Sequence, residues 1–186
     1  MTTSPRVIAI CGRKRSGKDT VASFICDKYG YSNAKFAEPL KASVQGLFGF
    51  SDYQLEVDKE SVDAFWGVSP REVMQFFGAH VVQYEFQKLL PGIGRSFFIK
   101  SLLARHKDDK IVISDLRFQH EFDAIKAIPN AIIFKLIRPS LTNEDNHISE
   151  REVDEIVVPD EFLLENNGSV EALLTKVDGV LARYCT

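Results

Sequence analysis

Residues 12–20 read Gly-Arg-Lys-Arg-Ser-Gly-Lys-Asp-Thr. The apolar run Val-Ile-Ala-Ile at residues 7–10 precedes this stretch, and an apolar pattern of helical spacing begins at Val21. The order is therefore strand, glycine-framed loop, helix. In such a turn, backbone N–H groups and a helix N-terminus surround a polyphosphate, and one lysine reaches its terminal phosphates. We expect residues 12–20 to bind a nucleoside triphosphate, with Lys18 as the catalytic lysine.

Every residue of this phosphate loop is a candidate for ATP binding. The candidates are Gly12, Arg13, Lys14, Arg15, Ser16, Gly17, Lys18, Asp19 and Thr20. Three cations follow one another inside the loop, so at least one must lie near the phosphates, and we favour Arg15 or Lys14 over Arg13. Two alternatives are a chance match in a surface turn and a phosphate site without turnover.

One position of the loop departs from the usual pattern, in which a Mg²⁺-binding hydroxyl follows the lysine. Here Asp19 follows Lys18, and the hydroxyl residue Thr20 comes next. We therefore expect altered metal handling, with Asp19, Thr20 and a carboxylate from another strand as the candidate Mg²⁺ ligands.

The composition favours one intracellular domain spanning residues 1–186. A chain of 186 residues that is 45% hydrophobic can bury a substantial core. Its net charge of -3 provides no broad basic field for nucleic acids or membranes, and no apolar run approaches the roughly 18 residues of a membrane span. We expect a cytoplasmic protein with small-molecule partners. The three cysteines are odd in number and lack metal-site spacing, which argues against disulfides and zinc.

Strand-like apolar runs alternate with helical patterns along the chain, which predicts an α/β fold of three layers: a mainly parallel sheet with helices on both faces. The runs lie at residues 7–11, 35–37, 111–114, 131–137 and 162–164. A helical region at about residues 38–90 is the expected substrate-binding part.

Local signals mark several boundaries. Ser69-Pro70-Arg71-Glu72 predicts a capping box that opens a helix running to about Lys88, and Ser169 opens the last helix. The polar stretch 139–159 lies between two strand-like runs and predicts a mobile lid.

Ligands of a parallel sheet gather at the carboxyl ends of its strands, so the residues after each strand are site candidates. Asp115 ends one strand and is expected to contact Mg²⁺ or the phosphate acceptor, the alternative being a carboxylate that caps the helix beginning near Phe118. Arg117 is expected to clamp a phosphate, the alternative being a solvated loop arginine. Arg138, at the entrance of the lid, is expected to reach the transferring phosphate. Gln119 and Glu121 follow on a helix, where a solvated face is an equal alternative.

Arg71 and Lys41 each lie in the first turn of a predicted helix. A cation is slightly unfavourable there, because that helix end carries a partial positive charge, so an anionic ligand is the more natural partner. A plain surface cation is the alternative. Gln75 follows Arg71 by one turn and presents an amide either to a base or sugar or to the protein interior.

These residues together resemble the deoxynucleoside monophosphate kinases of bacteriophages and large DNA viruses, which are P-loop nucleotide kinases. The resemblance covers nearly the whole chain. Its motifs are Lys14 to Thr20, the Pro39-x-Lys41 step, Arg71 through Gln75 to Gly78, Asp115-x-Arg117-x-x-His120-Glu121-x-Asp123-Ala124, Arg138-Pro139, His147 to Glu150, and Asn166-x-Gly168-Ser169. Within this family the Gly-Lys-Asp-Thr loop is a shared feature.

The resemblance implies transfer of the ATP γ-phosphoryl group to a deoxynucleoside 5′-monophosphate with Mg²⁺, in the synthesis of DNA precursors in the host cytoplasm. It implies catalytic roles for Lys18, Arg15, Arg138 and Asp115. Substrate contacts are implied for Lys14, Lys41, Arg71, Gln75, Asp115, Arg117, Gln119 and Glu121. It also allows a homodimer, although no surface stripe in the sequence marks one.

Two rival interpretations stay open at this point. One is a phosphomevalonate kinase of the animal type, which is similar in the loop from Lys14 to Asp19 and around Asp115 but has no counterpart of the block from Arg71 to Gly78. The other is a nucleotide-dependent switch that binds a triphosphate without turning over an acceptor.

Overall fold

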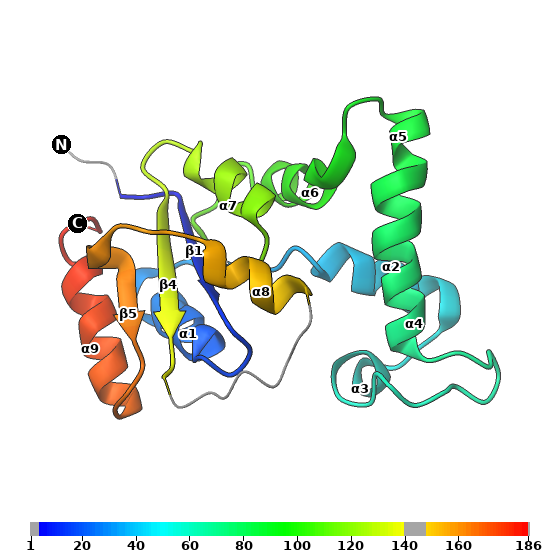
Figure 1. Ribbon diagram of the computed structural model, residues 1–186, viewed down its shortest axis with the longest axis horizontal. Coiled ribbons are helices and arrows are strands. Elements are labelled where there is room, and N and C mark those ends of the chain that lie inside the picture. Colours follow the sequence, from blue (N-terminus) through cyan, green and yellow to red (C-terminus); the bar gives the residue numbers. More distant parts are fainter. Residues whose placement is uncertain (1–3, 140–147, 186) are drawn as a thin grey trace. The chain divides into compact units, whose positions relative to one another are not determined.

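The computed structural model describes residues 4–139 and 148–185 (Figure 1). The chain divides into two compact units. Unit 1 combines Met1–Lys35 with Leu102–Thr186, and unit 2 is Phe36–Ser101. Each unit contains a cluster of buried apolar side chains of its own. The helical region expected at about residues 38–90 falls within unit 2, and its role in substrate binding stays a prediction.

Unit 1 contains a parallel sheet, as the sequence predicts. In the described part of the chain this sheet has five strands in the order β2-β3-β1-β4-β5, and every neighbouring pair is parallel. Its elements are β1 Val7–Gly12, α1 Lys18–Tyr29, β2 Ser32–Ala34, β3 Ile111–Leu116, α7 Gln119–Lys126, β4 Ile132–Ile137, α8 Ile148–Glu155, the short 3₁₀ helix Asp160–Phe162, β5 Leu163–Glu165 and α9 Val170–Leu181.

One predicted strand is misplaced. Residues 35–37 were expected to form it, but β2 ends at Ala34, which pairs with Ile113 of β3. Phe36 lies in a turn that leads into the next helix. The apolar character of Phe36 therefore reflects its burial in a turn, and Lys35 becomes the first residue after the strand.

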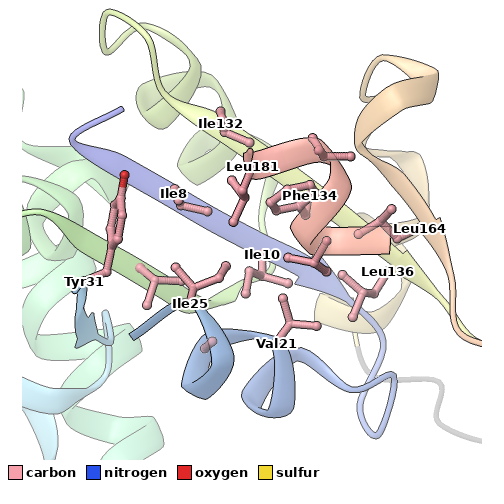
Figure 2. Packing of buried hydrophobic residues seen from close by; sticks show 14 of the residues in the cluster. Ile8, Ile10, Val21, Ile25, Tyr31, Ile132, Phe134, Leu136, Leu164 and Leu181 are labelled. Atoms are coloured by element: carbon pink, nitrogen blue, oxygen red, sulfur yellow. The ribbon is translucent and has the colours of Figure 1, made fainter. Parts of the chain in front are cut away.

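Helices cover both faces of the sheet. Alternate strand residues point to opposite sides, so each face presents side chains against which helices pack. On one face, Ile8 and Phe134 pack in a buried cluster with residues of α1 and α9, among them Val21 and Leu181 (Figure 2). On the other face, Nζ of Lys135 donates to two backbone carbonyls at the end of α8, at 2.7 and 2.6 Å. The expected three-layer arrangement is confirmed.

The segment 139–159, predicted as a mobile lid, is described only in part. Residues 140–147 lie outside the described residues. Further along, Val153 of α8 and Ile156 just after it are buried, so this portion of the segment is packed structure. The lid and its boundaries stay a prediction.

Unit 2 consists of helices. They are α2 Glu38–Phe48, α3 Asp52–Glu56, α4 Pro70–Gln75, the π-helical segment Phe76–Glu85, α5 Phe86–Leu89, a 3₁₀ turn Gly94–Ser96 and α6 Phe97–Arg105, which continues into unit 1. The predicted capping box is confirmed: Oγ of Ser69 accepts from the N–H of Glu72, and the Glu72 carboxylate accepts from the N–H of Ser69. The helix extends to Leu89 as expected, with a π-helical middle that the capping signal does not reveal.

Among the described residues, the structure contains no helix whose length and apolar character would let it cross a bilayer.

Candidate active site

The phosphate loop joins β1 to α1 through left-handed backbone. Gly12 has φ +147°, Gly17 has φ +105°, and Arg15, which is not a glycine, has φ +65°. L side chains rarely adopt such values, and they persist where the surrounding structure holds them. Backbone of this kind is where successive N–H groups converge into an anion-binding concavity.

The surrounding structure crowds both glycines, against backbone at Gly12 and against side chains at Gly17. A Cβ on Gly12 would lie 2.5 Å from the carbonyl oxygen of Leu136, and a Cβ on Gly17 would lie 2.9 Å from Nδ2 of Asn166. Asn166 follows β5, and its Nδ2 donates to the carbonyl of Ser16 at 2.9 Å. The ends of β4 and β5 therefore hold the loop closely from one side.

Lys18 points its ammonium into the loop. Its Nζ donates to the carbonyls of Gly12 and Arg13, each at 2.7 Å, and the residue is only 9% exposed. Lys18 is also the first residue of α1, where the helix carries a partial positive charge. The predicted contact of Lys18 with the terminal phosphates stays a prediction.

Ser16 lies inside the same loop and is only 1% exposed. Its hydroxyl group has no hydrogen-bond partner among the described residues. An unsatisfied buried hydroxyl costs free energy. A phosphate oxygen close to the loop would offset that cost, so the loop fits an anionic ligand better than an empty turn.

Asp19 meets the end of β3. Oγ of Ser114 donates to Oδ1 of Asp19 at 3.3 Å, and Nζ of Lys35 lies 3.8 Å from the same oxygen. Asp19 is 82% exposed in its side chain, and Thr20 is exposed as well. The predicted metal candidates Asp19 and Asp115 thus come from neighbouring elements, since Asp115 follows Ser114 on β3.

The described residues contain no group of three or more His, Cys, Asp and Glu side chains that could hold a metal by themselves. Mg²⁺ is commonly bound by one or two carboxylates together with water and substrate phosphates. The carboxylates of Asp19 and Asp115 at the phosphate loop fit that mode of binding. They are too few to surround a metal ion with protein oxygens alone.

Glu121 has a role that the sequence does not reveal. Its Oε2 accepts from the backbone N–H groups of Arg117 at 2.9 Å and Phe118 at 3.1 Å, which caps α7. The residue is 8% exposed, and burial raises its pKa to about 7, with the nearby Asp115 charge adding to the rise. Glu121 therefore fixes the turn that carries Arg117, and its predicted contact with substrate stays a prediction.

Two arginines near the loop have different partners. Nη1 of Arg138 donates to the carbonyl of Arg15 at 3.3 Å, and its contact with the transferring phosphate stays a prediction. Arg13 instead forms a bidentate pair with Asp154 of α8, in which Nε and Oδ1 are 2.9 Å apart, and this pair lowers the pKa of Asp154. Lys14 and Arg15 are exposed.

Three of the remaining four candidates have an acidic partner within their own unit, and the fourth, Gln75, is exposed. In unit 2, Lys41 pairs with Glu56, and Nε of Arg71 donates to Glu60 at 2.9 Å, while Gln75 is exposed at the end of α4. In unit 1, Gln119 donates to Asp123 at 2.9 Å on the exposed side of α7. Contacts of these four candidates with a ligand stay predictions.

The sequence interpretation assigned no site role to Asn166 or Lys35. Both directly follow a parallel strand, the same signal that singled out Asp115. Asn166 follows the short β5. Lys35 belongs to the predicted strand 35–37, whereas the observed strand β2 ends at Ala34. The error in the strand boundary therefore concealed Lys35.

Comparisons with known proteins point to one family. The family model described as "Deoxynucleotide monophosphate kinase" matches residues 6–64 and 51–177. The chain is 33% identical over 182 residues to a protein of Acanthamoeba polyphaga mimivirus named "Putative deoxynucleotide monophosphate kinase", covering 92% of this chain and 93% of that protein. It is 24% identical over 240 residues to the "Deoxynucleotide monophosphate kinase" of Enterobacteria phage T4, covering 95% and 98%.

Among solved structures, the dephospho-CoA kinase from Campylobacter jejuni is similar in fold. Its TM-score is 0.51 at 11% sequence identity, with 97% of this chain and 98% of that chain covered. At such low identity the similarity concerns the fold alone.

Replacing Gly12 by alanine should destabilise the protein by about 1–3 kcal/mol, because the new Cβ would meet a backbone carbonyl in a conformation unfavourable for alanine. Urea unfolding would measure the loss. The matched control is Gly179→Ala in α9, where a Cβ meets nothing within 4 Å and alanine favours the helix. Equal stabilities of the two variants would contradict the close contact at Gly12.

Replacing Glu121 by glutamine should make the variant progressively more stable, relative to the original protein, as the pH rises. The folded-state pKa of about 7 lies above the ordinary 4.5, so the stability contributed by the protonated carboxyl is complete below pH 4.5 and lost as the pH passes 7. Between these two pH values, the free energy of unfolding of Glu121→Gln should rise relative to that of the original protein by on the order of 3 kcal/mol. Urea unfolding at pH 5 and pH 8 would measure it.

Glu72→Gln provides the opposite control for this experiment. The hydrogen bonds from Ser69 lower the pKa of Glu72, so its ionised form stabilises the fold and that contribution is lost as the pH falls. A stability difference between Glu121→Gln and the original protein that does not change with pH would refute the raised pKa.

Proposed function

Because the chain belongs to the deoxynucleotide monophosphate kinase family, we propose that it transfers the γ-phosphoryl group of ATP to a deoxynucleoside 5′-monophosphate. The products are ADP and a deoxynucleoside diphosphate. The observation that carries the proposal is the left-handed phosphate loop with the Lys18 ammonium inside it, next to the strand end that presents Asp115.

ATP would occupy the loop, residues 12–20. Gly12 and Gly17 let the loop lie close against the ends of β4 and β5, and Lys18 lies in the right position to exchange its carbonyl partners for phosphate oxygens. Asp19, Thr20 and Asp115 would hold Mg²⁺ jointly with phosphate oxygens. When bound, Mg²⁺ neutralises charge that develops on the phosphates.

The acceptor needs little activation by the protein. The second pKa of a phosphate monoester is about 6, so near neutral pH its oxygen is already largely ionised and nucleophilic. Catalysis then depends on alignment and on neutralising charge in the transition state. Lys18, Arg15 and Arg138 would act on the transferring group, and Arg138 already lies against the loop.

Other charged and polar residues would bind the acceptor. We assign this role to Lys14, Arg117, Gln119 and Glu121, and the sequence motifs support the same role for Lys41, Arg71 and Gln75. Arg117 is supported most directly, because Glu121 holds its backbone at the end of β3. Glu121 would then contribute through the position of Arg117 as well as through its own predicted contact.

The relatives suggest the biological setting. The two described above come from a large virus and a bacteriophage, which supports a role in making DNA precursors in the cytoplasm of an infected cell. We also keep the homodimer as a proposal, to be decided by the mass of the protein in solution.

Purified protein with ATP and Mg²⁺ should form ADP when offered at least one of dTMP, dGMP, dCMP and dAMP. Lys18→Ala should lower this turnover by at least an order of magnitude, because a charge that contacts the transferring phosphate is lost. Lys28→Ala, at the opposite end of α1, is the control and should retain activity. Turnover only with mevalonate 5-phosphate, or ATP binding without any turnover, would overturn the proposal in favour of one of the two rivals.

Alanine at Arg117 or Arg71 should impair use of the acceptor more than binding of ATP. Each variant lacks an arginine that we propose to bind the monophosphate. The acceptor KM should therefore rise, or kcat should fall, by roughly tenfold or more. Steady-state kinetics with each substrate varied in turn would separate the two effects. Variants in which only ATP binding suffers would show that these roles are wrongly assigned.

A further inference from the structure

Lys35 lies at the carboxyl edge of the sheet, beside the phosphate loop. Ala34 pairs with Ile113, so the next residues along the two strands, Lys35 and Ser114, are neighbours at the strand ends. The Lys35 ammonium is 3.8 Å from Oδ1 of Asp19, the same oxygen that accepts from the Ser114 hydroxyl. The end of β2, β3 and α1 thus bring together the ammonium of Lys35, the hydroxyl of Ser114 and the carboxylate of Asp19. Asp115 is the next residue after Ser114.

The strand order places Lys35 on a particular side of the loop. β3 lies between β2 and β1, so Lys35 approaches from the β2 side, whereas Arg138 and Asn166 follow β4 and β5 on the other side of β1. A phosphoryl acceptor must lie beyond the terminal phosphate, roughly in line with it. Lys35 and Asp115 come from the two strands on one side of the loop, and they would flank such an acceptor together.

The ion pair between Lys35 and Asp19 is easily exchanged for a contact with phosphate. Both side chains are well exposed, at 44% and 82%, and their separation is near the upper limit for an ion pair. Exposed pairs of this kind contribute little stability. A phosphate monoester carries a charge of about -1.5 to -2 at neutral pH, so it attracts the ammonium more strongly than one solvated carboxylate does.

We infer that Lys35 contacts the 5′-phosphate of the acceptor monophosphate and helps to hold it in line with the donor, an inference that rests on the proposed function. A surface ion pair without function is one competing explanation. The other is an indirect effect in which Lys35 serves only to orient Asp19.

Calorimetric titration with dTMP, dGMP, dCMP and dAMP, without ATP or Mg²⁺, tests the inference apart from turnover. Lys35→Met should weaken binding of the accepted monophosphate roughly tenfold or more, because a charged hydrogen bond to phosphate is lost. Lys35→Arg should restore most of the affinity. Binding of ATP should change less than twofold. Lys28→Met removes another exposed, ion-paired lysine, which pairs with Asp178, and should bind like the original protein.

Asp19→Asn separates a direct contact from an indirect one. It removes the carboxylate partner but keeps the Lys35 cation, so a direct contact predicts monophosphate affinity at least equal to that of the original protein. An affinity loss equal to that of Lys35→Met would overturn the inference in favour of orientation through Asp19.

Unchanged monophosphate binding in Lys35→Met, alongside normal turnover by the original protein, would refute the role of Lys35 and leave the proposed function intact. No monophosphate binding and no turnover by the original protein would refute both. Thermal unfolding of each variant shows that the comparison concerns folded protein.

Discussion

The close approach of backbone to backbone at Gly12 is the constraint on which the site depends. The chain leaves β1 in a conformation suited to glycine, with the carbonyl of Leu136 too near to admit a Cβ. This contact lets the loop turn tightly enough for its own carbonyls to accept the Lys18 ammonium. Because the loop backbone is held in this way, the Lys18 ammonium can exchange these carbonyls for phosphate oxygens while the backbone keeps its conformation.

Positive charge at the site is local and held by specific partners. The net charge of the chain is -3, so no broad field attracts anions. Instead, Arg13 is held by Asp154, Lys35 lies near Asp19, and Arg138 donates to a loop carbonyl. These partners keep cations around the loop. A phosphate group can replace the weaker of them, which are the exposed ones.

Two glutamates with the same local role show how environment separates similar residues. Glu72 and Glu121 both accept from backbone N–H groups at the start of a helix. Hydrogen bonds lower the pKa of Glu72, whereas burial raises that of Glu121 to about 7. The capping pattern at Ser69 is readable from the sequence. The cap at Glu121 has no such signature, because a phenylalanine stands where a capping serine or threonine would be expected.

Short-range patterns in the sequence were sufficient to predict the phosphate loop, the parallel α/β fold and the helix that begins after Ser69. These three features follow from residues that are close in the chain, through glycine conformations, capping groups and the alternation of apolar runs. The family was predicted from the resemblance of motifs spread over nearly the whole chain. The tertiary structure alone decided that Lys35 lies near Asp19 and that Asn166 supports the loop. The contact of Asn166 with Ser16 spans 150 residues of the chain, and the contact of Lys35 with Asp19 depends on where β2 ends. Both depend on strand order and register, which local patterns do not determine.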